Sequence, residues 1–337
     1  MDDSFFLLDG NFFLIVILIL ASYIIAPIYI EKIYLRIAQR LNILSSDGKG
    51  VITGGGIVFP IVYIATEIAS LMSKGAFTYP YFLAGITIIA TVSFIDDMRN
   101  LPPLFRLAVH FMCAWLLIIQ AALSSLPIWE NIVFSVICVA IINAFNFLDG
   151  IKGITLFYAF VAFLFLPGVA TLFLLPIIAV GCYILRTPER CYLGDVGAIT
   201  FGYIFSFALI MDQIPYGIEP DCYWIYAPIP TPAIDFALLT HIAVYLADFG
   251  ITLLLRIYRR ENILQPHRKH LYQLLAYNCH INSMRVAMGY AAVQFVISTV
   301  FVMMPDNYRD LTAIASAGLL ILIYFIIYRR ISKIALT

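Results

Sequence analysis

The sequence predicts an all-α, polytopic membrane bundle of about eleven transmembrane helices, with the N-terminus outside and the C-terminus in the cytoplasm. Of the 337 residues, 63% are apolar or aromatic and only 12% are charged, whereas about a quarter of a soluble domain is charged. One span needs about 20 mainly apolar residues, so eleven spans take up most of the chain and leave only short connections. We therefore expect a single integral membrane domain over residues 1–337.

The spans are placed where apolar runs are bounded by charged residues or by Gly and Pro. Their expected ranges are 12–30, 56–73, 78–95, 106–123, 131–148, 154–168, 169–185, 197–212, 233–255, 284–304 and 311–328. With these spans, all of the 20 Lys and Arg residues except Lys74 and Arg309 fall on one side. That side is predicted to be cytoplasmic, because basic loops are retained there. The formal net charge of zero gives no support for a nucleic-acid partner.

Paired aspartates mark the cytoplasmic end of the third span. Asp96 and Asp97 stand in FIDDMRN, and polar groups beside apolar spans are candidates for function. Two adjacent carboxylates repel one another, which raises the proton affinity of one, while a nearby cation lowers it. One of the pair could act as a base and the other as an electrostatic or metal-associated group. The alternative is a solvated helix cap.

A polar segment, NAFNFLDGIKG, closes the fifth span. Asn143, Asn146 and Asp149 are spaced i, i+3, i+6, which predicts that they share one helical face. Gly150 and Gly153 then permit a tight turn and close approach of a ligand. The alternative is interhelical hydrogen bonding by the amides, which is common in membrane bundles.

A third carboxylate, Asp195, enters the eighth span in LGDVGAITFG. A carboxylate beside flexible backbone at a helix N-terminus suits a cation that carries phosphate. Alone, Asp195 could equally be an N-cap.

The longest cytoplasmic connection, RIYRRENILQPHRKHLYQ, is rich in basic residues. Its first arginines are interpreted as anchors that keep the loop in the cytoplasm. The later cluster His267–His270 gathers several donors, and Arg268 offers a bidentate fork that suits a pyrophosphate.

All four polar patches fall on the same predicted side of the membrane. Together they supply carboxylates and amides for a divalent cation, glycine-lined backbone and a basic clamp. This set of groups favours phosphoryl-type transfer, in which positioning and charge neutralisation do most of the catalysis. A lipid phosphate is a natural acceptor at this boundary. The competing hypothesis is a transporter with Glu67, Asp235 and Asp248 as coupling groups inside the membrane.

The order FIDD, NAFNFLDG, LGDVGA and HRKHLYQ resembles the polyprenyl-phosphate N-acetylhexosamine-1-phosphate transferases of glycosyltransferase family 4, over roughly residues 40–275. That family includes the phospho-MurNAc-pentapeptide translocase and the enzymes that initiate O-antigen synthesis. The resemblance implies transfer of an N-acetylated sugar 1-phosphate from a UDP-sugar to undecaprenyl phosphate, with release of UMP. It also implies a multi-pass protein of the bacterial inner membrane with a cytoplasmic active site. The HRKH motif is more similar to the O-antigen-initiating branch than to the histidine-rich form of the translocase.

The resemblance also implies roles for individual residues. Asp96 and Asp97 match the aspartates that activate the lipid phosphate or act near the metal. Asp195, assisted by Asn146, matches the site for Mg²⁺, with Mn²⁺ as the alternative ion. The basic residues matched to the phosphate-binding positions are Lys49, Arg106, His267, Arg268 and His270. Asn143 and Asp149 are expected to contact the substrate, and the oligomeric state is left open, with a homodimer as one option.

Overall fold

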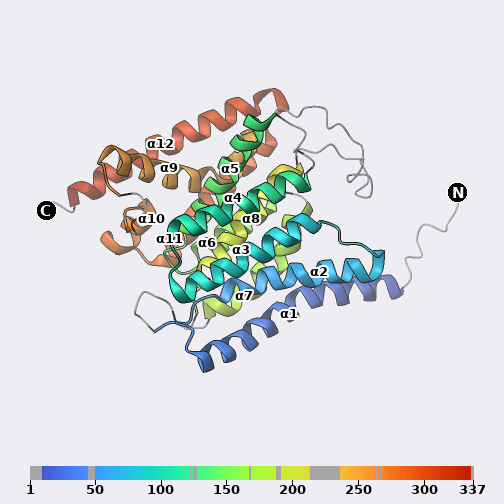
Figure 1. Ribbon diagram of the computed structural model, residues 1–337. Coiled ribbons are helices and arrows are strands. Elements are labelled where there is room, and N and C mark those ends of the chain that lie inside the picture. Colours follow the sequence, from blue (N-terminus) through green and yellow to red (C-terminus); the bar gives the residue numbers. More distant parts are fainter. Residues whose placement is uncertain are drawn as a thin grey trace.

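The computed structural model describes residues 10–44, 50–121, 123, 127–166, 168–186, 191–212, 236–262, 265 and 267–334. These residues form twelve helices and no strand beyond isolated bridges (Figure 1). The helices are α1 Gly10–Leu41, α2 Val58–Lys74, α3 Pro80–Arg99, α4 Pro103–Gln120, α5 Ile128–Phe147, α6 Ile154–Leu164, α7 Leu174–Arg186, α8 Gly194–Asp212, α9 Ala243–Tyr258, α10 Leu271–Gln273, α11 Ser283–Met303 and α12 Arg309–Ile334. Short helical turns are η2 Gly55–Ile57, η4 Gly168–Phe173, η6 Phe236–Ile242, η7 Leu274–Asn278 and η8 Asp306–Tyr308.

The predicted all-helical membrane bundle is confirmed. Within the described chain, 8 helical segments are long and apolar enough to cross a membrane. The remaining predicted spans coincide with α1, which has 32 residues, and with α6 and α7, which have 11 and 13. The last two are shorter than the roughly 20 residues of a full span. The protein is therefore a multi-pass membrane protein.

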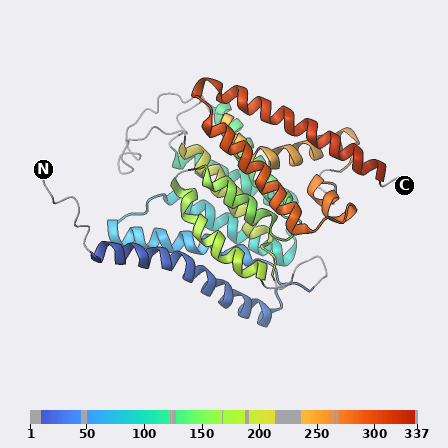
Figure 2. The same ribbon diagram turned by 180° about the vertical axis from the view of Figure 1, so that it is seen from behind.

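Helix α8 occupies the centre of the bundle, between α3 and α5 (Figures 1 and 2). Of its apolar window 89% is buried, compared with 11% for α12 at the periphery. Small residues explain the close packing, since a Cβ atom at Gly202 would lie 2.7 Å from the Cα of Ile142 in α5. Inside a membrane, no hydrophobic force drives helices together, so their association depends on close packing. Glycine permits that packing because it lets helix backbones approach closely. The central position of α8 brings its first turn among several other helix ends.

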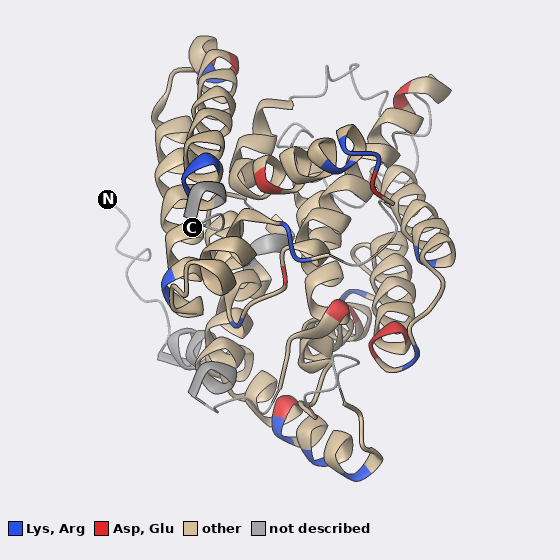
Figure 3. Cartoon of the chain, turned by 90° about the vertical axis from the view of Figure 1, so that its left-hand side faces the viewer, with Lys and Arg blue, Asp and Glu red and all other residues tan. Residues whose placement is uncertain are grey.

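Several helices begin or end at the same end of the bundle. Helix α1 begins at the opposite end and α12 finishes at this one (Figures 1 and 2). Seen from this side, the end of the bundle carries both Lys and Arg and Asp and Glu (Figure 3). One expectation is corrected here, because α5 ends at Phe147 and Asp149 lies in the turn that follows. Asp149 therefore does not continue the helical face of Asn143.

Candidate active site

The carboxylate of Asp97 joins the end of α3 to the start of α8. It accepts hydrogen bonds from the backbone N–H groups of Asp195, at 3.0 Å, and Val196, at 3.2 Å. The hydroxyl of Thr53 donates a third, at 3.0 Å. The first N–H groups of a helix have no partner within it and carry partial positive charge. Asp97 thus fixes the position of Asp195 while its own charge is stabilised by the helix terminus.

Arg106, in the first turn of α4, links the two other carboxylates. Its Nη1 forms an ion pair with Asp96 Oδ2 and lies 3.2 Å from Asp195 Oδ2. Asp96 is buried, and its second oxygen accepts the N–H of Leu101 at 2.5 Å. Asp96 is therefore fully engaged in holding Arg106 and the α3–α4 turn. The structure brings the two motifs together, although they are almost 100 positions apart in the chain.

A cavity of about 840 Å³ opens beside this cluster. Asp97 and Asp195 line one part of it, Asp149 and Lys152 another, and His267 a third. Its volume lies in the range typical of small-ligand and cofactor sites. Acidic and basic groups therefore line a common space of the size of a small-ligand site.

Asp149 lies in the turn that connects α5 with α6. Its Oδ1 accepts a hydrogen bond from Thr155 at 2.6 Å. Burial raises the pKa of Asp149 to about 7, and repulsion from the charge of Asp97 adds to the effect. Asp149 is thus a cavity-lining carboxyl whose protonation changes near neutral pH.

The basic cluster 267–270 does not act as one patch. His267 and Arg268 line the cavity, and the Arg268 guanidinium lies 5.6 Å from the ring centre of Tyr277. Lys269 instead pairs with Glu261 at 2.6 Å. His270 is buried, with 3% of its surface exposed, and is not among the residues described along the cavity. Burial, together with nearby His270, Arg256 and Lys269, lowers the pKa of His267 to about 4. The imidazole ring of His267 is therefore neutral at pH 7.

Four further predicted site residues are not among the described residues that line the cavity, namely Asp96, Arg106, Asn143 and Asn146. The amide Nδ2 of Asn143 donates to Val139 O within its own helix, at 2.7 Å, and lies 3.5 Å from His110 Nδ1. Lys49 lies outside the described residues.

A glycine-rich segment that the motifs did not single out supports the acidic cluster. The N–H groups of Gly55 and Gly56 donate to the carbonyls of Tyr192 and Leu193 at 3.0 and 2.8 Å, which seats residues 53–56 against the start of α8. Gly194 has φ 77°, and a Cβ there would lie 2.5 Å from Asp97 Oδ2. Glycine is required at such a conformation. The three consecutive glycines after Thr53 were the available signal for this contact.

The donor set at Asp97 and Asp195 fits Mg²⁺ only in part. No group of three or more His, Cys, Asp or Glu side chains in the described part of the chain is arranged to hold a metal ion. Mg²⁺, however, commonly uses one or two carboxylates and completes its octahedron with water and substrate phosphates. Asp97 and Asp195 can supply those two carboxylates at the cavity wall.

The carboxylates invoked for transport have other partners. Glu67 accepts hydrogen bonds from Tyr63 at 2.6 Å and from the N–H groups of Thr78 and Tyr79 at 2.8 and 3.4 Å. It therefore holds the entry to α3. Asp248 is bound by donors from neighbouring helices, and Asp235 lies outside the described residues. These contacts favour structural roles for Glu67 and Asp248.

Comparison with known protein families gives a match for the segment that carries the acidic cluster. Residues 79–212 match the model of glycosyl transferase family 4. The matched segment runs from the entry of α3 to the end of α8 and includes Asp96, Asp97 and Arg106 as well as Asp149 and Asp195. No curated protein matches the chain.

Proposed function

We propose that this chain is a polyprenyl-phosphate sugar-1-phosphate transferase, a proposal supported by the match of residues 79–212 to the model of glycosyl transferase family 4. It transfers an N-acetylated sugar 1-phosphate from a UDP-sugar to undecaprenyl phosphate and releases UMP. The product is a polyprenyl-diphosphate sugar that initiates a cell-surface polysaccharide of the O-antigen type. The protein acts at the cytoplasmic face of a bacterial inner membrane, and the whole chain works as one domain.

The observation that carries this proposal is the convergence of Asp97, Asp195 and Arg268 on one cavity. Phosphoryl transfer depends mainly on positioning and on neutralising phosphate charge. The lining carboxylates suit a cation, and the Arg268 guanidinium in the same lining suits phosphate oxygens. The membrane location provides access for the lipid tail while its phosphate reaches the cavity.

The geometry distinguishes the two paired aspartates. Asp96 is buried in its contacts with Arg106 and Leu101, whereas Asp97 lines the cavity. We assign Asp97 to orienting the lipid phosphate and, together with Asp195, to holding Mg²⁺. Mg²⁺ would neutralise the diphosphate of the nucleotide sugar. Asp96 keeps Arg106 directed at Asp195, and His267 and Arg268 stabilise charge on the leaving UMP.

Purified protein in lipid nanodiscs, given undecaprenyl phosphate, Mg²⁺ and labelled UDP-sugars, tests the proposal. We expect UMP release with UDP-GlcNAc, UDP-GalNAc or one of their 6-deoxy relatives, and formation of a labelled lipid in equal amount. Asp195→Asn should reduce turnover about 100-fold or more, the scale on which electrostatic groups at a reacting centre act. Asp306→Asn is the matched control, because that carboxylate is 87% exposed.

Two outcomes would contradict the proposal. One is the absence of UMP and labelled lipid with every sugar while the wild-type protein is monodisperse. The other is near wild-type turnover by Asp195→Asn, which would remove Asp195 from the metal site. Movement of a UDP-sugar or ion across the bilayer without UMP release would instead support the transport hypothesis.

A further inference from the structure

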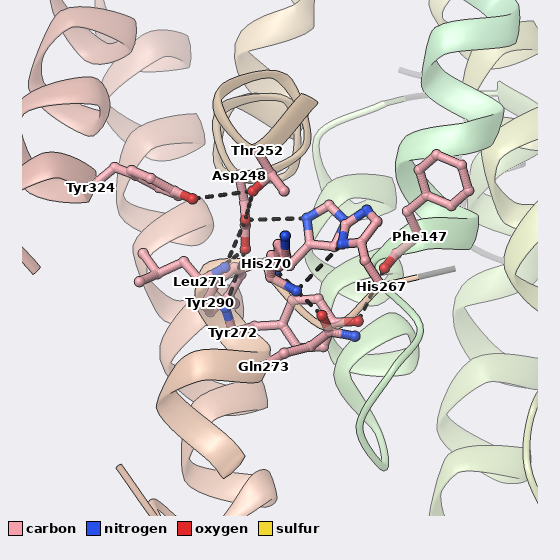
Figure 4. A network of polar contacts seen from close by, with 11 residues as sticks. Phe147, Asp248, Thr252, His267, His270, Leu271, Tyr272, Gln273, Tyr290 and Tyr324 are labelled. Atoms are coloured by element: carbon pink, nitrogen blue, oxygen red, sulfur yellow. Dashed lines mark hydrogen bonds and ion pairs between the residues drawn. The ribbon is translucent and has the colours of Figure 1, made fainter. Parts of the chain in front are cut away.

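A buried carboxylate outside the cavity organises the segment that carries the basic residues (Figure 4). Asp248 of α9 is 2% exposed. Its donors are the hydroxyls of Tyr290, at 2.7 Å, and Thr252, at 3.2 Å, and the N–H groups of Leu271, at 2.9 Å, and Tyr272, at 3.3 Å. His270 Nδ1 lies 3.4 Å from its Oδ1. Because a buried carboxylate is costly unless it is well hydrogen-bonded, four donors indicate a defined structural position.

Two of these bonds determine where α10 begins. The N–H groups of Leu271 and Tyr272 belong to the first turn of α10 and have no partner within it. The Asp248 side chain satisfies both from a neighbouring helix. The residues immediately before this turn, His267–His270, are thereby held at a fixed distance from α9.

The contact with Asp248 also defines the orientation of His270. Nδ1 of His270 lies 3.4 Å from Asp248 Oδ1, so the ring is turned with Nδ1 toward α9. His270 Nε2 is buried and has no hydrogen-bond partner among the described residues. The ring of His267 lies against that of His270, with centroids 4.8 Å apart and a 31° tilt. His267 lines the cavity, so the order from the interior outward is Asp248, His270, His267.

The same segment is hydrogen-bonded to the end of α5 and to the turn that follows it, which also lines the cavity. The Tyr272 hydroxyl donates to Phe147 O at 3.0 Å, and the Tyr277 hydroxyl donates to Gly150 O at 2.9 Å. A Cβ at Gly150 would lie 2.1 Å from the Tyr272 hydroxyl oxygen, so the turn fits closely against α10. A shift of α10 would therefore move both His267 and the turn that carries Asp149.

We propose that Asp248 is a positioning residue for the diphosphate of the nucleotide sugar, acting through His270 and the first turn of α10 on His267 and Arg268. The inference rests on the proposed function and adds a residue that does not itself line the cavity. Asp248 holds His267 and Arg268 in position before the substrate binds. This lowers the free-energy cost of ordering these two side chains on binding.

Asp248→Asn tests the inference, with Tyr290→Phe as its matched control. The amide keeps the shape of the carboxylate but loses its charge and one acceptor oxygen. We expect KM for the UDP-sugar to rise about tenfold, equivalent to about 1.4 kcal/mol, and KM for undecaprenyl phosphate to stay within about twofold. Tyr290→Phe removes a bond to the same carboxylate but leaves those to α10 and His270, so both KM values should stay close to wild type.

The readout separates positioning from a purely structural role. Loss of folded protein lowers the apparent kcat but leaves KM unchanged, because KM does not depend on how much enzyme is active. Unchanged KM for the UDP-sugar in Asp248→Asn would overturn the inference, as would an equal rise in Tyr290→Phe.

A second variant decides the matter if Asp248→Asn does not fold. His270→Asn keeps an N–H near the position of Nδ1 but removes the ring that packs on His267, and it should also raise KM for the UDP-sugar about tenfold. An unchanged KM in that variant contradicts the inference. If the wild-type protein turns over no UDP-sugar, the proposed function fails. An unchanged KM in a variant of an active enzyme contradicts only the inference about Asp248.

Discussion

At the scale of single residues, Arg106 holds together carboxylates that would otherwise repel one another. It pairs with buried Asp96 and reaches Asp195 at 3.2 Å. Removing one member of a buried ion pair is costly because the remaining charge has no partner, while removing both charges is often tolerated. The pair therefore makes a prediction about stability that does not depend on activity.

Arg106→Gln should lower the free energy of unfolding by about 3 kcal/mol, within the range observed for broken buried pairs. The double variant Asp96→Asn, Arg106→Gln should recover part of that loss, because it neutralises the more deeply buried of the two carboxylates that Arg106 pairs with. Thermal unfolding of the two variants in the same detergent measures the difference. Equal destabilisation by the single and double variants would show that the ion pair is not the source.

Asp149 predicts a pH dependence of stability. Its pKa is raised to about 7 from a usual value near 4, so the folded state binds a proton more tightly than the unfolded state. The stability linked to this proton is present at low pH and is lost as pH rises from about 4 to about 7.

Asp149→Asn should abolish this component. We expect its melting temperature to exceed that of the wild type by about 2–4 °C at pH 8, the shift that roughly 1 kcal/mol produces in a large domain. The difference should shrink as pH falls toward 4. A difference that stays constant from pH 4 to pH 8 would contradict the raised pKa.

At the scale of helices, the sequence locates the polar patches but not how each one is used. Charged residues bound the apolar runs, so the ends of α3 and α8 were predictable, and so was the meeting of Asp97 and Asp195. The end of α5 was not, because Asp149 continues the helical spacing although the backbone turns after Phe147. The inward position of His270 could not be predicted either, because it depends on Asp248, which lies on another helix and 22 positions away.

Glycines in the helices provide matched test positions. A Cβ at Gly202 of α8 would lie 2.7 Å from the Cα of Ile142, whereas one at Gly289 of α11 meets nothing within 4 Å. Gly202→Ala must therefore separate α5 from α8, and we expect a loss of about 1–3 kcal/mol, as for other overpacked sites. Gly289→Ala should be neutral or slightly stabilising, since alanine is the better helix former. Thermal unfolding checks both, and equal melting temperatures would show that α5 and α8 are not tightly packed there.

At the scale of the whole molecule, the distribution of charge predicts the orientation in the membrane. With the predicted spans, nearly all Lys and Arg residues fall on one side and Lys74 and Arg309 fall on the other. Lys152 and Arg268, which line the cavity, belong to the basic side. By the positive-inside rule we predict that the cavity opens toward the cytoplasm. Two exposed positions at the two ends allow this to be measured. Asp306, beside Arg309, is 87% exposed, and Lys269, near the cavity, is 48% exposed.

Asp306→Cys should react with a membrane-impermeant maleimide in intact spheroplasts. Lys269→Cys should react only after the membrane is permeabilised, because the reagent cannot reach the cytoplasmic side before then. The unsubstituted protein, which has six cysteines, gives the background in both conditions. If Lys269→Cys is labelled in intact spheroplasts and Asp306→Cys is not, the orientation is reversed and the cavity opens away from the cytoplasmic nucleotide pool. Such a result would contradict the proposed reaction even though the fold and the cavity are unchanged.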